Sequence, residues 1–322
     1  TALLIDAPGL EKIRAVYSKL SGTTEQPRDV IYRGKLAILH DSMSSELALI
    51  SSQLFRIAKA SRSSQDFTLP ALHRALREVI ACFSVYRTYL PRTGWEVSDE
   101  DHRRVMEAVR WAKRRNRTMN WRVLDYIASV LLLEFPPALT DELRQRWRQF
   151  ATRFQQVTGP IAAKGVEDTA FYRYFPLLAM NEVGGELEGA GLSLEQFTSK
   201  MQERARSWPH SLSATATHDT KRGEDVRARL DVLSEVPDQW ATLVENLNAL
   251  TKGSLTEVEG ELVPSFNERY FIYQTLVGTW PRDHWEQYHD RLCGYFQKSM
   301  REAKEHTSWM NPSEAYEAAI EG

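Results

Sequence analysis

The sequence is poor in cysteine: it has two among 322 residues, Cys82 and Cys293. They stand far apart and form no CxxC pair, which excludes a disulfide framework and a paired-cysteine zinc site. We therefore interpret both as reduced thiols, as expected of a cytoplasmic protein. The sequence also lacks an HExxH motif and a glycine-rich phosphate loop. We accordingly expect neither a metal nor another cofactor.

Long apolar runs and an excess of charge of one sign are missing as well. No apolar run reaches the ~18 residues that a membrane helix needs, and the amino end has no signal-peptide pattern. The 41 basic and 43 acidic residues leave a formal net charge of -2. Without an overall field to attract polyanions or anionic lipid, we expect no nucleic-acid or membrane partner.

Helical patterns dominate what is present. Apolar residues recur every three or four positions from Val30 to Ala60, which predicts one long helix. Thr68, Ser98 and Ser193 are suited to cap the starts of further helices. Additional helices are predicted at 122–134, 140–156, 224–234, 238–250, 266–278, 283–305 and 312–321. Two short segments, 79–89 and 212–217, are rich enough in β-branched, aromatic or small residues to predict strands.

The second of these strands leads into a motif that could carry chemistry. The threonine-rich segment 212–217 is followed by His218, Asp219 and a dense run of charge. A strand, a short loop and a helix in this order form a βα unit, and in a (β/α)8 barrel catalytic groups lie at the carboxyl ends of strands. The alternative is that Asp219 caps the following helix and that His218 is an ordinary loop histidine.

A second polar segment, 159–174, mixes charge with aromatic rings. Lys164, Glu167, Asp168 and Arg173 alternate with phenylalanine and tyrosine around a glycine. Sugar sites need this mixture, because hydroxyl groups require polar partners and the apolar faces of the rings pack on aromatic side chains. The alternative is an internal salt-bridge cluster that holds the loop.

Several motifs in a fixed order resemble the maltooligosyl trehalose synthases, a family within the α-amylase superfamily. The motifs are Gly159–Tyr174, Asn181–Gly185, the His-Asp segment and Pro264–Tyr270. The resemblance implies an intramolecular glycosyltransferase, a mutase that converts the reducing-end α-1,4 linkage of a maltooligosaccharide into an α,α-1,1 linkage. It implies trehalose biosynthesis, with a trehalohydrolase as the pathway partner.

The resemblance also assigns residues. Such enzymes use an Asp nucleophile, a Glu acid/base and a later Asp in a His-Asp motif. Asp219 matches the third, as a transition-state stabiliser, with His218 beside it. We expect the first two to precede Thr1, so that this chain is an internal or C-terminal fragment, inactive without the remainder of the same polypeptide. Residues expected to bind the maltooligosaccharide are Lys164, Glu167, Asp168, Arg173, Lys221 and Arg222; Lys221 and Arg222 could instead form ion pairs within their loop.

The predicted fold is mainly α with few short strands, a helical insertion joined to part of an incomplete (β/α)8 barrel. Residues 1–158 are predicted to form the helical insertion, with one barrel strand near 79–89. Residues 159–322 are predicted to hold the substrate loop, the His-Asp strand and the helices that follow. The alternative function is a non-catalytic helical module that binds carbohydrate or protein through residues 164–174.

Overall fold

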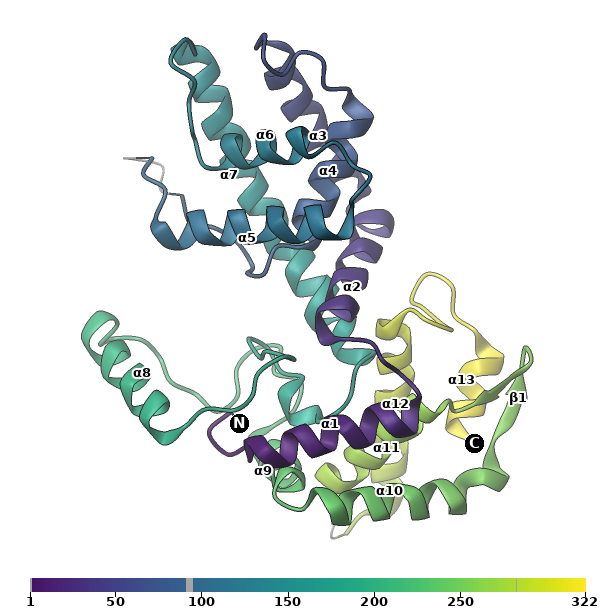
Figure 1. The fold of residues 1–322 in the computed structure, drawn as a ribbon. Coiled ribbons are helices and arrows are strands. Elements are labelled where there is room, and N and C mark those ends of the chain that lie inside the picture. The colour runs from purple at the N-terminus through teal and green to yellow at the C-terminus, as the bar shows by residue number, and fades with distance from the viewer. Residues whose placement is uncertain (1, 91–94, 282) are drawn as a thin grey trace. The chain divides into compact units, whose positions relative to one another are not determined.

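The computed structural model describes residues 2–90, 95–281 and 283–322 and is built mainly of helices, which confirms the mainly α part of the prediction (Figure 1). The part of a (β/α)8 barrel stays a prediction. The chain divides into two compact units. Residues 31–166 form the continuous unit, and residues 1–30 together with 167–322 form the discontinuous unit.

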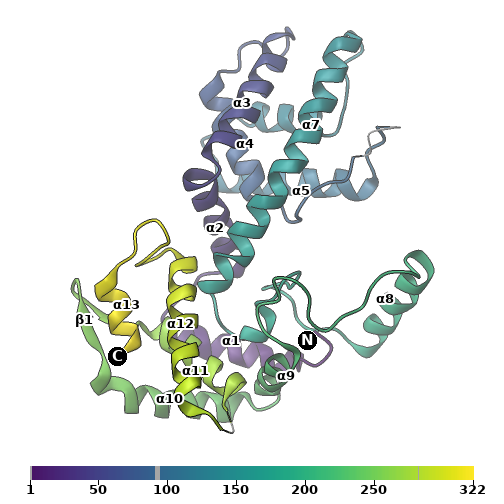
Figure 2. The ribbon, with the colours of Figure 1, turned by 180° about the vertical axis from the view of Figure 1, so that it is seen from behind.

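The continuous unit is a helical bundle around one apolar core. Its helices are α2 (Pro27–Asp41), α3 (Ser44–Lys59), α4 (Leu69–Ala81), α5 (Asp99–Arg115), α6 (Trp121–Leu131) and α7 (Asp141–Ala162). Helix α3 packs against both α4 and α7 (Figure 2). The predicted caps are confirmed at the starts of α4 and α5, where the Thr68 and Ser98 hydroxyls accept from backbone N–H groups three residues later.

Two expectations for this unit were wrong. The single helix predicted from Val30 to Ala60 is two helices, because α2 ends at Asp41 and α3 begins at Ser44. Residues 79–89 are not a strand, because 79–81 complete α4 and an irregular segment follows. Val79 and Ile80 are buried in the bundle core together with Leu72 of the same helix. Helical packing of this apolar stripe outweighed the β propensity of the residues.

Helix α7 extends further than predicted. Gly159 and Pro160, where we placed a domain boundary, lie inside it, and it continues into a π-helical turn at Ala163–Glu167. Gly165 in this turn leaves no room for a side chain, since an added Cβ would lie 2.7 Å from the Cα of Lys35. The predicted domain division of the chain stays a prediction.

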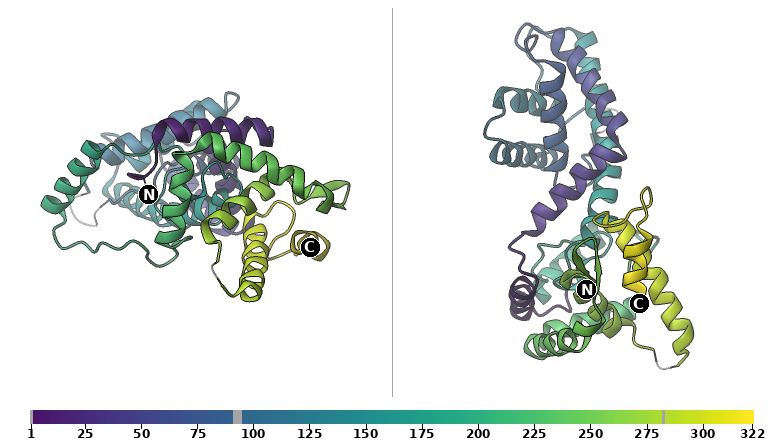
Figure 3. Two further views of the ribbon diagram at one scale, coloured as in Figure 1. Left: turned by 90° about the horizontal axis from the view of Figure 1, so that it is seen from below. Right: turned by 90° about the vertical axis from the view of Figure 1, so that its right-hand side faces the viewer.

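The discontinuous unit packs helices around aromatic residues. Its helices are α1 (Ala7–Ser21), α8 (Leu194–Ser207), α9 (Glu224–Asp231), α10 (Pro237–Thr251), α11 (Phe266–Thr279), α12 (Trp285–Ala303) and α13 (Glu314–Glu321). The buried Trp240 of α10 donates to the hydroxyl of Tyr270 of α11 at 2.8 Å. Tyr17 of α1 packs against the Tyr270 ring at 5.2 Å. Helix α8 opens with the predicted capping box at Ser193 but has no buried residue, and it projects from the unit (Figure 3).

The strands that the structure forms are not those predicted. Among the described residues, β1 (Thr256–Val258) and β2 (Glu261–Val263) pair as an antiparallel hairpin. Glu259 and Gly260 join them with φ angles of 53° and 87°, the two positive values that a type I′ turn requires. Residues 212–217, which were predicted to form a strand, are irregular and exposed. A strand needs a hydrogen-bonded neighbour, and no described segment pairs with these residues.

Asp231, at the end of α9, is a buried carboxylate without a hydrogen-bond partner among the described residues. Burial raises its pKa to about 6. The folded state therefore holds this proton more tightly than the unfolded state, so stability falls as pH rises from about 4 to about 6 and stays reduced above.

We expect Asp231→Asn to raise the free energy of unfolding at pH 7 by about 2 kcal/mol, because the amide carries no charge to desolvate. Urea unfolding of the variant and the parent chain at pH 7 and pH 4 measures this effect, and the gain should vanish at pH 4. Glu235→Gln, at an exposed neighbouring site, is the matched control. A gain of equal size at both pH values would contradict the assignment.

Candidate functional site

The centre of the site is the carboxylate of Glu182, which joins two loops distant in sequence. It accepts the backbone N–H groups of Val183 at 2.9 Å, Lys221 at 2.7 Å and Arg222 at 2.9 Å. Glu182 itself is only 9% exposed. Three charge-assisted bonds in a buried position fix the backbone directly after the His-Asp pair.

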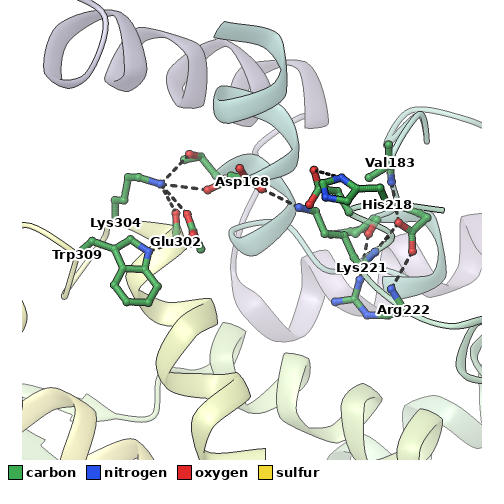
Figure 4. Close-up of polar contacts among 12 residues, drawn as sticks. Asp168, Val183, His218, Lys221, Arg222, Glu302, Lys304 and Trp309 are labelled. Carbon is green, nitrogen blue, oxygen red and sulfur yellow. Dashed lines mark hydrogen bonds and ion pairs between the residues drawn. The ribbon is translucent and has the colours of Figure 1, made fainter. Parts of the chain in front are cut away.

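Asp168 lies between two lysines. Lys221 Nζ donates to its carboxylate Oδ1 at 2.7 Å, and Lys304 Nζ donates to its backbone oxygen at 3.1 Å, so that the two amines approach from different sides (Figure 4). The Lys221 side chain is 12% exposed and that of Asp168 is 22% exposed. Lys221 Nζ also lies 6.0 Å from the centre of the Tyr172 ring. The pair is thus a partly buried ion pair flanked by an aromatic face.

Lys304 is held by its surroundings at the end of α12. Its amine also donates to the Thr169 hydroxyl at 3.2 Å, and to the backbone oxygen and carboxylate of Glu302 at 2.8 and 3.3 Å. The other Glu302 oxygen accepts the indole N–H of Trp309 at 3.0 Å. Burial lowers the pKa of the Lys304 amine. The amine therefore serves to tie the 168–169 backbone to α12.

The two arginines predicted to bind substrate donate to neutral acceptors, and Arg173 Nε also lies 3.7 Å from the Glu305 carboxylate. Arg222 is buried, and its guanidinium donates to the backbone oxygen of Asn181 at 3.0 Å and to the Tyr295 hydroxyl at 3.1 Å. Arg173 donates to the backbone oxygens of Ala303 at 2.6 Å and Lys304 at 3.4 Å. These bonds hold the loops, but those of the Arg222 guanidinium are not the ion pairs that the alternative interpretation named. A sugar contact by the same side chains stays a prediction.

His218 and Asp219 stand in solvent. Their side chains are 95% and 70% exposed, and His218 Nδ1 lies 3.1 Å from the Asp219 carboxylate. Asp219 has a φ of 63°, in the left-handed region. The turn is closed by the backbone N–H of Thr217, which donates to the Thr220 hydroxyl at 2.7 Å. The pair is therefore not at the end of a buried strand in this structure, and its catalytic role stays a prediction.

The structure brings some of the predicted residues together. Asp168, Lys221 and Arg222 share one network through the adjacent loops (Figure 4). Lys164 and Glu167 both lie in the π-helical turn Ala163–Glu167, and Glu167 is buried. Their contact with substrate stays a prediction.

Three residues of this network were missed. Glu182 and Asn181 lie in a motif that we used only for the resemblance, and the Asn181 amide donates to the backbone oxygens of Phe171 at 2.9 Å and Tyr174 at 2.7 Å. A lone Glu before a glycine pair was the available signal. Lys304 gave none, because its partners in this loop, Asp168 and Thr169, are more than 130 positions away along the chain.

Within residues 2–90, 95–281 and 283–322, no three His, Cys, Asp or Glu side chains group as metal ligands would. The same residues include no helix both long and apolar enough to cross a membrane. The site consists of carboxylates, cations and aromatic rings, which suits recognition of a neutral polyhydroxylated ligand.

Comparison with known proteins confirms the resemblance stated from the motifs. No protein-family model matches the chain. Two proteins from strains of Mycobacterium tuberculosis, provisionally named maltooligosyl trehalose synthase, are 41% identical over 174 residues. That match spans 53% of this chain and 21% of each relative.

Solved structures extend the match to nearly all of the chain. The maltooligosyltrehalose synthase of Arthrobacter ramosus is similar over 99% of this chain, with a TM-score of 0.77 and 28% identity. A further maltooligosyl trehalose synthase gives a TM-score of 0.68 and 27% identity over 98% of the chain. This chain covers 36% of each of these structures.

Proposed function

We propose that this chain, which resembles maltooligosyl trehalose synthases along almost its whole length, supplies one part of an enzyme of trehalose biosynthesis. The enzyme would convert the reducing-end α-1,4 linkage of a maltooligosaccharide into an α,α-1,1 linkage by intramolecular transglycosylation. The observation that supports this most is the similarity over 99% of the chain to a solved structure of a maltooligosyltrehalose synthase. A cytoplasmic location and a trehalohydrolase acting on the product belong to the same proposal.

In the proposed enzyme, Asp219 stabilises the transition state. Breaking the glycosidic bond develops positive charge on the sugar ring, and a fixed anion that hydrogen-bonds the ring hydroxyls gains strength as that charge forms. His218, 3.1 Å away, would donate to a neighbouring hydroxyl. The exposure of both side chains leaves them accessible to a ligand.

The loop network would hold this pair in place. Glu182 fixes the backbone N–H groups of Lys221 and Arg222, two and three residues after Asp219. Lys221 and Asp168 form the ion pair next to the Tyr172 ring. We assign Lys164, Glu167, Asp168, Arg173, Lys221 and Arg222 to the surroundings of the glucose units next to the scissile bond.

The remaining catalytic groups lie elsewhere in this proposal. Retention of configuration needs a nucleophilic carboxylate and an acid/base carboxyl about 5.5 Å apart, and we assign these to segments outside this chain. Residues 212–217 would then become a barrel strand, because segments from the rest of the protein would supply the neighbours that they lack here. The 322-residue chain alone would be inactive.

Incubation with maltopentaose tests the proposal. The protein that joins this chain to the remainder of its reading frame should remove reducing ends without releasing glucose, whereas the 322-residue chain should leave them unchanged. Release of glucose or shorter maltodextrins as the main products would indicate a hydrolase instead. No change in either sugar with the longer protein would overturn the proposal and favour a non-catalytic binding module.

A further inference from the structure

A cavity of about 570 Å³ lies beside the candidate site, within the discontinuous unit. It is bounded by α9, by the C-terminal end of α11 and by the first half of α12. The close crossing of α9 and α11 forms its floor, where an added Cβ on Gly278 would lie 2.8 Å from the Val226 side chain. Its volume is within the range of small-molecule sites.

The walls of this cavity carry an excess of positive charge. Arg222, Arg229 and Arg291 line it, and Asp225 is the one carboxylate of its described lining. The Arg222 guanidinium donates to the neutral Asn181 and Tyr295 oxygens, as described above, whereas its backbone N–H donates to Glu182.

The other two guanidinium groups also lack a carboxylate partner among the described residues. Arg229 donates to the backbone oxygens of Gly278 at 3.2 Å and Trp280 at 3.3 Å. Arg291 forms no hydrogen bond or ion pair within the part of the chain that the structure describes, and it is exposed. Lys221 adds no net charge, because Asp168 neutralises it.

Physical chemistry favours an anion in such a cavity. A guanidinium as buried as that of Arg222 is costly without a counter-charge, and neutral acceptors supply only part of the lost hydration. Phosphate presents several oxygens to which planar guanidinium groups donate in pairs. With a neutral sugar in the cavity, Asp225 would be the one carboxylate of the described lining to offset the three arginines.

Aromatic side chains line the same cavity next to the arginines. Trp280 is 55% exposed and packs edge-on against Trp285 at 5.1 Å. Tyr288 also lines the cavity, and its hydroxyl lies 2.8 Å from the Thr279 hydroxyl. An exposed indole supported by a second ring offers a flat apolar face, and hydroxyls at its edge can bond a polar ring substituent.

We propose that this cavity binds a small phosphorylated sugar, with its phosphate on Arg222, Arg229 and Arg291 and its ring against Trp280. The proposed reaction places Lys221 and Arg222, at one end of the lining, near the maltooligosaccharide, and it assigns no ligand to Arg229, Trp280 or Arg291. The site is separate from His218 and Asp219, so occupancy can be measured without catalysis.

Isothermal titration of the 322-residue chain at low ionic strength tests the proposal with three probes: glucose 6-phosphate, inorganic phosphate and glucose. Glucose 6-phosphate should bind more tightly than inorganic phosphate, and glucose should show no binding at the same concentrations. Arg291→Gln should weaken both phosphate probes by about tenfold, as expected for loss of a charge-assisted bond. Trp280→Ala should weaken glucose 6-phosphate and leave inorganic phosphate unchanged.

Lys298→Gln is the matched control, since Lys298 is an exposed cation of the same helix outside the cavity lining. Its affinities should equal those of the parent chain. Equal weakening by Lys298→Gln and Arg291→Gln would indicate unspecific charge attraction and overturn the proposal. So would the absence of binding by either phosphate probe, or binding of glucose as tight as that of glucose 6-phosphate.

Discussion

Replacing Asp219 with asparagine in the whole protein is expected to lower kcat for maltopentaose conversion by about 10²–10³-fold, with little change in KM. Loss of one preorganised electrostatic group from a transition state has an effect of this size. Because the ground-state sugar carries no charge, its binding depends less on the anion than the transition state does. The measurement is the initial rate of reducing-end loss over a range of maltopentaose concentrations.

Asparagine removes the charge of Asp219 and suits the backbone conformation at this position. Asp219 has a φ of 63°, which asparagine adopts more readily than alanine, so the turn need not rearrange. Its side chain is 70% exposed, and the pairing with His218 is an exposed contact of small energetic value. The melting temperature should therefore stay within about 2 °C of the parent, as expected when surface stability is unchanged.

The chain contains a matched control for this experiment. His289 and Asp290 form a second His-Asp pair on α12, with Nδ1 and Oδ1 3.5 Å apart and the Asp290 side chain 87% exposed. Asp290→Asn makes the same chemical change, also beside a histidine, and should leave kcat unchanged. If Asp219→Asn keeps the kcat of the parent, Asp219 is not part of the catalytic site, whatever the control shows.

Features set by local sequence could be predicted well. The caps at Thr68, Ser98 and Ser193 are formed as expected, because a hydroxyl reaches the backbone only three residues away. The helical period of the apolar residues also predicted α6 and the helices after residue 224, with bounds that agree within two or three positions. In these segments local preference and packing agree.

Features set by contacts distant in sequence could not be predicted. Segments 79–89 and 212–217 have β-prone compositions, but a strand depends on neighbours that a single segment does not reveal. The start of the first segment packs into the core of a helical bundle, and the second has no strand partner among the described residues. The same limit applies to the site. Lys304 donates to the backbone oxygen of Asp168, 136 positions earlier in the chain, and no local pattern at either residue indicates this contact.

Glu182→Gln is expected to have the largest effect on stability, lowering the free energy of unfolding by about 4 kcal/mol. One carboxylate oxygen of Glu182 accepts the N–H groups of Val183 and Lys221, and the other accepts that of Arg222. In glutamine, one of these positions becomes an NH₂ group, which can only donate. A buried backbone N–H then faces another donor, and the remaining bonds lose the strength that ionisation gives them.

Urea unfolding followed by tryptophan fluorescence measures the loss of stability, and hydrogen exchange locates it. The amides of Lys221 and Arg222 should exchange faster in Glu182→Gln, because their acceptor is the group that changes. Glu186→Gln, in the same loop at an exposed position, should remain within about 0.5 kcal/mol of the parent. If both variants unfold at the same urea concentration as the parent, Glu182 does not hold the loop. If stability falls without faster exchange at these two amides, Glu182 acts through other contacts, and the backbone after Asp219 is positioned by the Lys221–Asp168 pair instead.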